Sequence, residues 1–298
     1  MSAASAGAGV ARQFSPRSAR VGELKTEFLQ GGKGAPLLYL HGLSRPLGWD
    51  TDHIGLALHR RVYAPVLPGW KAGCLPSQVT SIQDYARLML AFLEEEKIEK
   101  ADLVGHSFGG ASAIRASIQH PDKVRRLVVI SSPYARSGWY PLAQEGMSRV
   151  GASLAEHLMQ TPTGKFSTQW PNPQRFSQFL DKFGKMMSEP YDWSADIATL
   201  PMPVLLVFAD NDSISQQHIA EFFALVGGGI KEPGWLNTQL SKSRLAVVPG
   251  YSHYNFITSP EVPQIIGKFL ADPLTNPPTG GAAASQVSPA PRRRPKKP

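Results

Sequence analysis

The sequence has almost no cysteine and no long apolar stretch. Its single cysteine, Cys74, cannot form an intrachain disulfide, and one thiolate cannot make a cysteine-rich zinc site. No run reaches the roughly eighteen apolar residues that a membrane-spanning helix needs, so no span is expected. Residues 1–20 also lack the apolar stretch of a secretory signal. These absences lead us to expect a cytoplasmic protein.

Acidic residues are missing from both ends of the chain. Residues 1–20 and 273–298 hold eight of the 31 basic residues and none of the 23 acidic ones, so the 23 basic residues between them balance the acids and the formal charge of +8 belongs to the ends. Both ends are rich in small residues or proline. We therefore predict a disordered N-terminal tail at 1–20 and a disordered basic C-terminal tail at 273–298.

The basic C-terminal tail is interpreted as a solubilising segment. Contact with an acidic partner, an anionic surface or RNA remains the alternative. Because the folded body between the tails is formally neutral, the basic pI says little about what that body binds. Nucleic-acid binding is not expected as the main function.

Short apolar runs alternate with helical patterns between the tails of this 298-residue chain. Apolar runs of this length are typical of strands that are buried on both faces of a parallel sheet. The alternation predicts an α/β fold with a mostly parallel central sheet flanked by helices. The predicted strands are 36–40, 61–65, 101–105, 126–131, 203–209 and 244–249, and the predicted helices are 82–95, 109–120, 216–226 and 263–270.

Residues 132–200 interrupt this alternation. They contain no strand-like run, but they contain helical or irregular pieces with many aromatic residues. A helical insertion between two strands explains this pattern. We predict a core made of 21–132 and 201–272, with a helical cap at 133–200.

A candidate nucleophile lies in the sequence Gly105-His106-Ser107-Phe108-Gly109, between a predicted strand and a predicted helix. In a sharp strand-to-helix turn, small residues on either side let the backbone pass and raise the serine hydroxyl above the sheet edge. The pattern alone is weak, and the strand before it and the helix after it give it weight. The His106 side chain is expected to point away from Ser107.

Acyl transfer also needs two N–H donors for the oxyanion that develops on the substrate. One is expected from Phe108, the residue after the nucleophile. The other is expected from Leu43, in the loop that follows strand 36–40. His41 in the same loop is interpreted as structural, holding the loop by hydrogen bonds.

A serine nucleophile needs a base, and the base needs an orienting carboxylate. Of the eight histidines, His253 follows the last predicted strand and so lies at the sheet edge where Ser107 would emerge. Strand 203–209 ends at Asp210 and Asp212. Asp212 lies further into the loop and can reach a histidine, whereas Asp210 is expected to cap the turn through local backbone groups.

These motifs resemble the α/β-hydrolase fold family over about residues 35–270, in its branch with a serine nucleophile. The resemblance rests on the His41-Gly42 loop, the segment 66–69 (Val-Leu-Pro-Gly) and the segment 250–253 (Gly-Tyr-Ser-His). It implies that Asp212 is the acid and that 133–200 covers the active site. Val66 stands where many relatives carry aspartate, and the long segment 227–242 has no counterpart in the resemblance.

The resemblance implies a serine hydrolase, because relatives that cleave epoxides or carbon–halogen bonds carry aspartate at the position of Ser107. We expect a carboxylesterase that acts on a small-molecule ester or related acyl substrate through an acyl-enzyme, with no metal or organic cofactor. Hydrolysis of a carbon–carbon bond in a dienone-type substrate and cofactor-free perhydrolase chemistry are the alternatives. The non-enzymatic alternative is a ligand-binding receptor in which the triad of Ser107, His253 and Asp212 catalyses no reaction.

Overall fold

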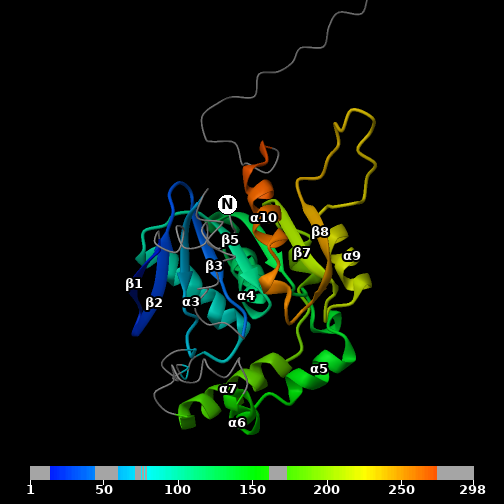
Figure 1. Cartoon of the computed structure of the whole chain (residues 1–298). Helices are drawn as coiled ribbons and strands as arrows, with labels where there is room; N and C mark the ends of the chain where they lie inside the picture. Colours follow the sequence, from blue (N-terminus) through cyan, green and yellow to red (C-terminus); the bar gives the residue numbers. More distant parts are fainter. Residues whose placement is uncertain are drawn as a thin grey trace, which may run out of the picture.

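The computed structural model describes residues 14–43, 60–70, 75, 77, 79–160 and 173–273 (Figure 1). Residues 1–13 and 274–298 of the two predicted tails, and Cys74, lie outside the described residues.

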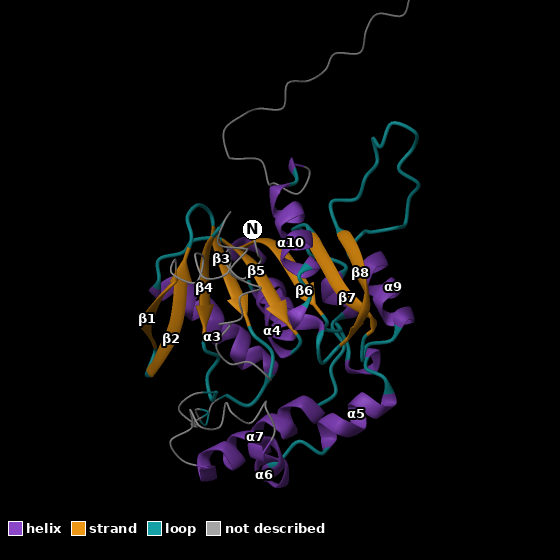
Figure 2. Ribbon diagram, viewed as in Figure 1, coloured by secondary structure: helices purple, strands orange, loops and turns teal. Residues whose placement is uncertain are grey.

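The described residues form one eight-stranded sheet in the order β1-β2-β4-β3-β5-β6-β7-β8 (Figure 2). From β4 to β8 in this order, neighbouring strands are parallel, whereas β1 and β2 form an antiparallel edge. The α/β prediction is confirmed, and each predicted strand is present. The strands are β1 (Phe14–Val21), β2 (Leu24–Gly31), β3 (Pro36–Leu40), β4 (Arg61–Pro65), β5 (Ala101–His106), β6 (Val124–Ile130), β7 (Val204–Asn211) and β8 (Arg244–Ser252).

Strand β1 corrects the predicted N-terminal tail. Phe14–Val21 pairs with β2 along its whole length, from Phe14 opposite Gly31 to Val21 opposite Leu24. Ala19 and Val21 are buried in the core. The boundary at residue 21 is therefore wrong, and the folded body includes Phe14. The sequence concealed this strand because it carries Pro16, which only an edge strand tolerates well.

Helices cover both faces of the sheet. Leu38 and Leu40 of β3 belong to the apolar cluster that includes residues of α3 (Ile82–Glu95), α4 (Phe108–Gln119) and α9 (Gln216–Leu225). Leu37 and Tyr39 belong to the cluster that includes residues of α10 (Glu261–Ala271). This alternation along β3 is the period of two that strand geometry imposes, and both faces are apolar because both are covered.

Four described α-helices lie between β6 and β7 in the chain, and the first three of them lie beyond the carboxyl ends of the strands in space (Figure 1). Residues 138–140, which lead into these helices, are joined to the segment that follows β7. The Tyr140 N–H donates to the Ser213 carbonyl and the Ser215 N–H to the Gly138 carbonyl, both at 2.9 Å. The helices are α5 (Pro141–Ser148), α6 (Ala152–Gln160), α7 (Pro173–Ser188) and α8 (Ser194–Ile197).

A buried ion cluster joins β5 to β6. Asp102 has no exposed side-chain surface and contacts Arg126, which is equally buried, at 3.3 Å, and the Nε of Arg60 at 2.9 Å. Ion pairs in such a place are costly to break, because removing one partner leaves the other charge buried without compensation.

We therefore expect Asp102→Ala to lower the free energy of unfolding by about 3–5 kcal/mol. Asp196→Ala removes the half-exposed partner of Arg115 and should cost less than about 1 kcal/mol. Urea denaturation of both variants, followed by circular dichroism, measures the difference. Equal losses in the two variants would contradict the role given to the buried cluster.

Candidate active site

Ser107 occupies a strained turn between β5 and α4. Its backbone has φ 52° and ψ −117°, a conformation that residues other than glycine rarely adopt. The Ser107 N–H donates to the Ile130 carbonyl at 2.8 Å, and Phe108 begins α4 directly after it. The turn thus lies at the carboxyl end of β5, beside the end of β6.

The flanking glycines make this turn possible. A Cβ atom on Gly105 would lie 2.2 Å from the Gly109 carbonyl oxygen, and one on Gly109 would lie 2.2 Å from the Leu40 carbonyl oxygen. Both obstacles are backbone atoms, which cannot move aside as a side chain can. The physical reason given above for the two glycines is therefore supported atom by atom.

The structure brings together the three side chains predicted as nucleophile, base and acid. Ser107 Oγ lies 3.1 Å from Nε2 of His253, and Nδ1 of His253 lies 3.0 Å from Oδ1 of Asp212. The His253 side chain is 13% exposed and that of Asp212 is fully buried. These distances allow one continuous hydrogen-bond chain from hydroxyl to carboxylate.

The second carboxylate oxygen of Asp212 is also held. Oδ2 accepts a hydrogen bond of 2.5 Å from the hydroxyl of buried Ser131 and one of 3.3 Å from the Ala209 N–H. The sequence analysis missed Ser131. Its position directly after β6, at the same sheet edge as Ser107, was the available signal. Its hydroxyl fixes the carboxylate so that Oδ1 stays directed at His253.

Asp210 has a different role from the one predicted. Its Oδ1 accepts hydrogen bonds from the N–H groups of Gly250 at 2.9 Å and Tyr251 at 3.3 Å. It therefore holds the backbone that leads to His253 rather than capping its own turn. Sequence spacing could not reveal this, because the partners lie some forty residues along the chain.

Three aromatic rings lie beside the His253 imidazole, and one of them is the ring of the next residue, Tyr254, at 5.6 Å between centroids. The ring centroid of Trp139 lies 5.2 Å away with the rings nearly perpendicular, and that of His106 lies 5.9 Å away with the rings nearly parallel. The expectation that His106 points away from the site is wrong. Together these rings restrict how far the imidazole can turn.

The loop that carries Leu43 is held by the His41 side chain, as predicted. Nε2 of His41 accepts from the Leu67 N–H at 3.0 Å, while Nδ1 lies 2.7 Å from the Gly42 carbonyl oxygen. The ring therefore donates from Nδ1 and accepts at Nε2, which requires the neutral form. The Leu43 carbonyl accepts from Nε1 of Trp70 at 3.0 Å.

The two predicted oxyanion donors belong to segments that meet at Ser107. A Cβ atom on Gly42 would lie 3.3 Å from Cβ of Ser107, so the loop passes close to the turn. Phe108 is the first residue of α4, and an N–H at that position has no acceptor within its helix. This N–H lies at the N-terminus of α4, the positive end of the helix dipole, which favours negative charge near Ser107.

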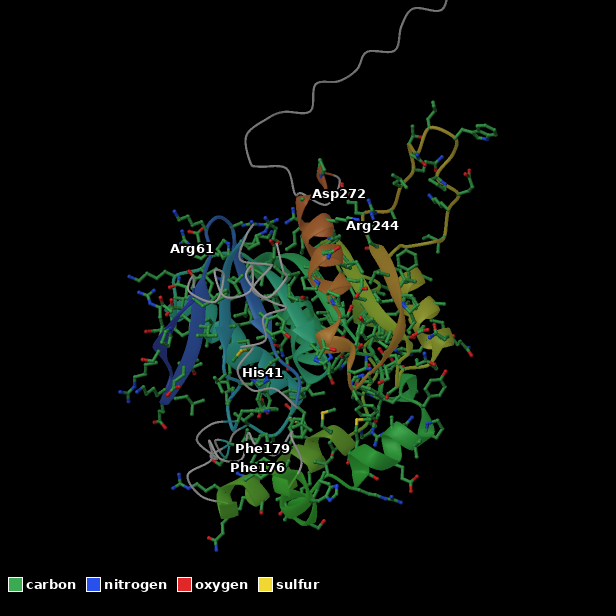
Figure 3. All side chains as sticks on the ribbon, viewed as in Figure 1. His41, Arg61, Phe176, Phe179, Arg244 and Asp272 are labelled. Carbon is green, nitrogen blue, oxygen red and sulfur yellow. The ribbon has the colours of Figure 1, made fainter. Side chains whose placement is uncertain are left out.

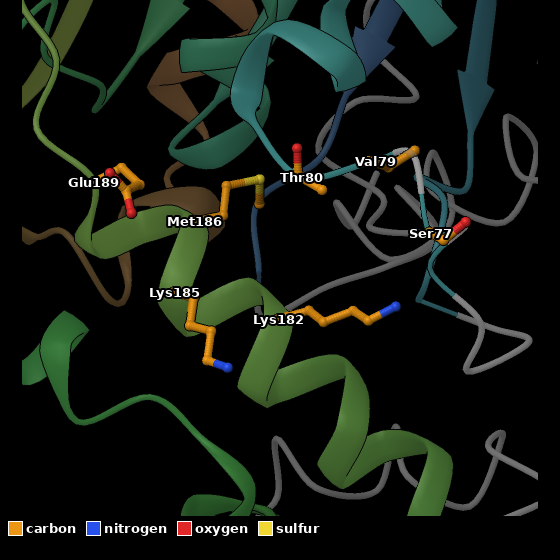
Figure 4. Close-up of a pocket in the computed structure, with 7 residues that line it drawn as sticks. All are labelled: Ser77, Val79, Thr80, Lys182, Lys185, Met186 and Glu189. Atoms are coloured by element: carbon orange, nitrogen blue, oxygen red, sulfur yellow. The ribbon is translucent and has the colours of Figure 1, made fainter.

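A small surface pocket of about 160 Å³ lies between α7 and the segment before α3 (Figure 4). None of the predicted catalytic residues lines it. It is lined by Ser77, Val79, Thr80, Lys182, Lys185, Met186 and Glu189.

Sequence and structure comparisons define the class of protein. The model of the alpha/beta hydrolase family matches residues 37–262, so the chain belongs to the alpha/beta hydrolase family. The matched region includes the Ser107 turn, Asp212 and His253. Among the described residues, no group of three or more His, Cys, Asp or Glu side chains is placed to hold a metal ion, and no helix is long and apolar enough to cross a membrane.

Individual relatives include a carboxylesterase and a 2-hydroxymuconate semialdehyde hydrolase. The 2-hydroxymuconate semialdehyde hydrolase of Pseudomonas sp. (strain CF600) is 35% identical over 37% of this chain, and the match spans only 40% of that enzyme's length. Carboxylesterase YbfK of Bacillus subtilis (strain 168) is 27% identical over 66% of this chain and 71% of its own. The crystal structure of the B. subtilis carboxylesterase CesB (YbfK) superposes with a TM-score of 0.65 at 19% identity, covering 90% of this chain and 95% of that one.

The pKa values of two buried histidines predict how the free energy of unfolding depends on pH. Burial lowers the pKa of His41 and of His218 from 6.5 to about 4 in each case. His218 lies on α9, where its ring accepts a hydrogen bond from the Tyr134 N–H at 3.3 Å. Between pH 6.5 and 4 the unfolded chain binds protons that the folded chain does not, so the free energy of unfolding falls as the pH drops. Each histidine should contribute a loss of about 2 kcal/mol from pH 7 to pH 5.

Urea denaturation at pH 7 and pH 5 tests this expectation. His218→Gln should reduce the loss between the two values, because one titrating group is removed. His120→Gln, which removes an exposed imidazole, is the control variant. An unaltered pH dependence in His218→Gln would show that burial does not keep this ring neutral.

Proposed function

We propose that the chain is a serine hydrolase that cleaves carboxylic esters, with Ser107 as nucleophile, His253 as base and Asp212 as orienting acid. The observation that carries the proposal is the hydrogen-bond chain from Ser107 Oγ through both ring nitrogens of His253 to Asp212. Membership of a hydrolase family with carboxylesterases among its members supports the choice of reaction.

The first half of the reaction forms an acyl-enzyme. The Asp212 carboxylate accepts a hydrogen bond from the Nδ1–H of His253, so the unprotonated Nε2 can take the Ser107 proton as Oγ attacks the ester carbonyl. The carbonyl oxygen gains negative charge, which the N–H groups of Leu43 and Phe108 stabilise. The protonated imidazole then gives its proton to the departing alkoxide, and an alcohol leaves.

The second half of the reaction releases the carboxylic acid product. Water takes the place of the alcohol, and Nε2 of His253 removes a proton from it as it attacks the acyl carbonyl. The tetrahedral intermediate uses the same two N–H donors, and its collapse returns the proton to Ser107 Oγ. Helices α5–α8, which we propose as a cap, would limit access of water to this site.

Carbon–carbon bond hydrolysis is the second candidate. The match to 2-hydroxymuconate semialdehyde hydrolase favours it, although that match covers less than half of either chain. Turnover of p-nitrophenyl esters of graded acyl length, measured beside a dienone substrate, separates the two candidates. The candidate whose substrate gives the higher kcat/KM is retained.

A fluorophosphonate probe tests the nucleophile directly. We expect it to label the wild-type protein and to leave Ser107→Ala unlabelled, with esterase activity lost in that variant. A residual rate of about 10³–10⁴ over water can persist, because the oxyanion donors remain. The fold should be retained, since a single hydroxyl at the sheet edge is removed.

Ser148→Ala, on the exposed surface of α5, is the matched control and should label like the wild type. Circular dichroism confirms folding in both variants. Labelling or wild-type turnover in Ser107→Ala would contradict the nucleophile assignment. A wild-type protein that does not react with the probe would favour the receptor with an idle triad.

The two aspartates after β7 provide the second test. Asp212→Asn should hold the His253 ring in the wrong tautomer. The same exchange costs about 10⁴ in kcat in a serine protease, so we expect kcat to fall by at least about 10² here. Asp210→Asn keeps a carbonyl oxygen for the N–H groups of Gly250 and Tyr251 and should cost less than about tenfold. Both variants are assayed on one ester at the pH optimum. An inactive Asp210→Asn beside an active Asp212→Asn would identify the other aspartate as the acid.

A further inference from the structure

The N–H of Leu43, one of the two proposed oxyanion donors, belongs to a peptide unit that a side chain holds. A trans peptide unit is planar, and its N–H and its carbonyl point in opposite directions. The Leu43 N–H shares its unit with the Gly42 carbonyl, whose oxygen lies 2.7 Å from Nδ1 of His41. His41 therefore fixes the direction of this N–H from the opposite end of the same peptide unit.

Trp70 holds the next peptide unit along the chain. Its side chain is buried, and its Nε1–H donates to the Leu43 carbonyl at 3.0 Å. Two consecutive carbonyls of this loop are thus held, one by His41 and one by Trp70. Turning the Leu43 N–H requires changed backbone angles at Gly42 or Leu43, and such a change breaks at least one of the two hydrogen bonds.

The same indole also contacts the residue of the second proposed donor. The ring centroid of Trp70 lies 5.6 Å from that of Phe108, with the ring planes 29° apart. It lies 5.2 Å from the His41 imidazole, with the two rings nearly perpendicular. Trp70 therefore contacts both segments that carry the proposed donors.

Helix α7 packs against this indole. The ring centroids of Phe179 and Phe183 lie 4.8 Å and 5.3 Å from that of Trp70, both edge to face. A Cβ atom on Gly69, the residue before Trp70, would lie 2.7 Å from the Phe179 ring, so α7 also lies close to the backbone there. Figure 3 shows Phe179 below His41, with Arg244 and Asp272 above both.

We propose that Trp70 is a positioning residue for the reaction: supported by α7, it keeps the N–H groups of Leu43 and Phe108 directed at one oxyanion. The role rests on the proposed function, because the oxyanion arises only in acyl transfer. Packing alone needs the aromatic ring of Trp70, whereas positioning also needs the Nε1–H that holds the Leu43 carbonyl. Removing this donor while keeping a ring separates the two roles.

Trp70→Phe makes that separation. Removing an oxyanion donor outright costs about 10²–10³ in kcat, so loosening one should lower kcat by about 10- to 100-fold. KM should stay within about threefold of the wild type, because the negative charge develops only in the transition state. Steady-state kinetics with one p-nitrophenyl ester measure both constants.

The rate of labelling by a fluorophosphonate tests the same donors without an ester substrate. The phosphonyl oxygen takes the place of the ester oxyanion when Ser107 attacks phosphorus. Trp70→Phe should therefore label at least about tenfold more slowly than the wild type. Labelling should still reach completion, because the nucleophile, the base and the acid are unchanged.

Tyr85→Phe is the matched control. Tyr85 is buried in the same aromatic cluster, and its hydroxyl donates to the Pro68 carbonyl at 2.8 Å. This variant also loses one buried hydrogen bond to the main chain and keeps a ring, so both variants should lower the melting temperature. In Tyr85→Phe, kcat and the labelling rate should stay within about twofold of the wild type.

A double-mutant cycle tests the support from α7. Phe179→Leu should lower kcat by about three- to tenfold, because the indole of Trp70 is held less firmly. In a Trp70→Phe background the same change should lower kcat by less than about twofold, since the hydrogen bond through which it acts is already absent. Circular dichroism confirms folding in each variant. Factors that simply multiply in the double variant would contradict the support from α7.

Two results would overturn the role of Trp70 while leaving the proposed function intact. One is a Trp70→Phe variant with wild-type kcat and labelling rate. The other is an equal loss of kcat in Tyr85→Phe, which would show that any weakening of this cluster has the same effect. A wild-type protein that reacts with neither ester nor probe overturns the proposed function and the role of Trp70 together. If the wild type labels but hydrolyses no ester, only the choice of substrate is wrong, and the labelling rates decide the role of Trp70.

Discussion

The contact of backbone with backbone at the turn between β5 and α4 is the constraint on which the site depends. Gly109 lies against the carbonyl of Leu40 in the neighbouring strand, and Gly105 lies against the first turn of α4. No side chain larger than hydrogen fits at either place. This close approach holds Ser107 at positive φ, and the energy of that strain is offset by the packing of the buried strands on either side. The hydroxyl is thereby fixed at the sheet edge before any substrate binds.

Asp212, the proposed acid, and residues 138–140, which lead into the proposed cap, form one hydrogen-bonded unit. Residues 213–215 follow Asp212 directly, and each pairs with the segment 138–140, in which Trp139 pairs with Ile214 and also contacts the His253 ring. A shift of residues 138–140 would therefore move both the Asp212 carboxylate and the His253 imidazole. Ser131 opposes such movement by holding the second carboxylate oxygen from the neighbouring strand. Substrate bound beneath α5–α8 would thus act on the geometry of the groups proposed as acid and base.

The sequence was sufficient for the features that are local, namely the buried strands, their order along the chain, and the positions of Ser107 and His253 at strand ends. It was not sufficient for features set by contacts between distant segments. Ser131 and Asp210 act through partners on other strands, and only the register of β6, β7 and β8 reveals them. The direction of His106 depends on the strained backbone beside it. Strand β1 was missed because an edge strand tolerates proline and exposed charge, which conceal the usual alternation.

A parallel sheet has two unlike edges, and this chain places different features at each. At the carboxyl edge the strands end in Ser107, Asp212 and His253, the residues proposed as nucleophile, acid and base. At the amino edge the loops are remote from these groups, and an insertion such as 227–242 leaves the triad undisturbed because it enters β8 at Arg244, the far end from His253. The exposed Trp235 and Leu236 of this insertion favour aggregation unless something covers them for part of the time.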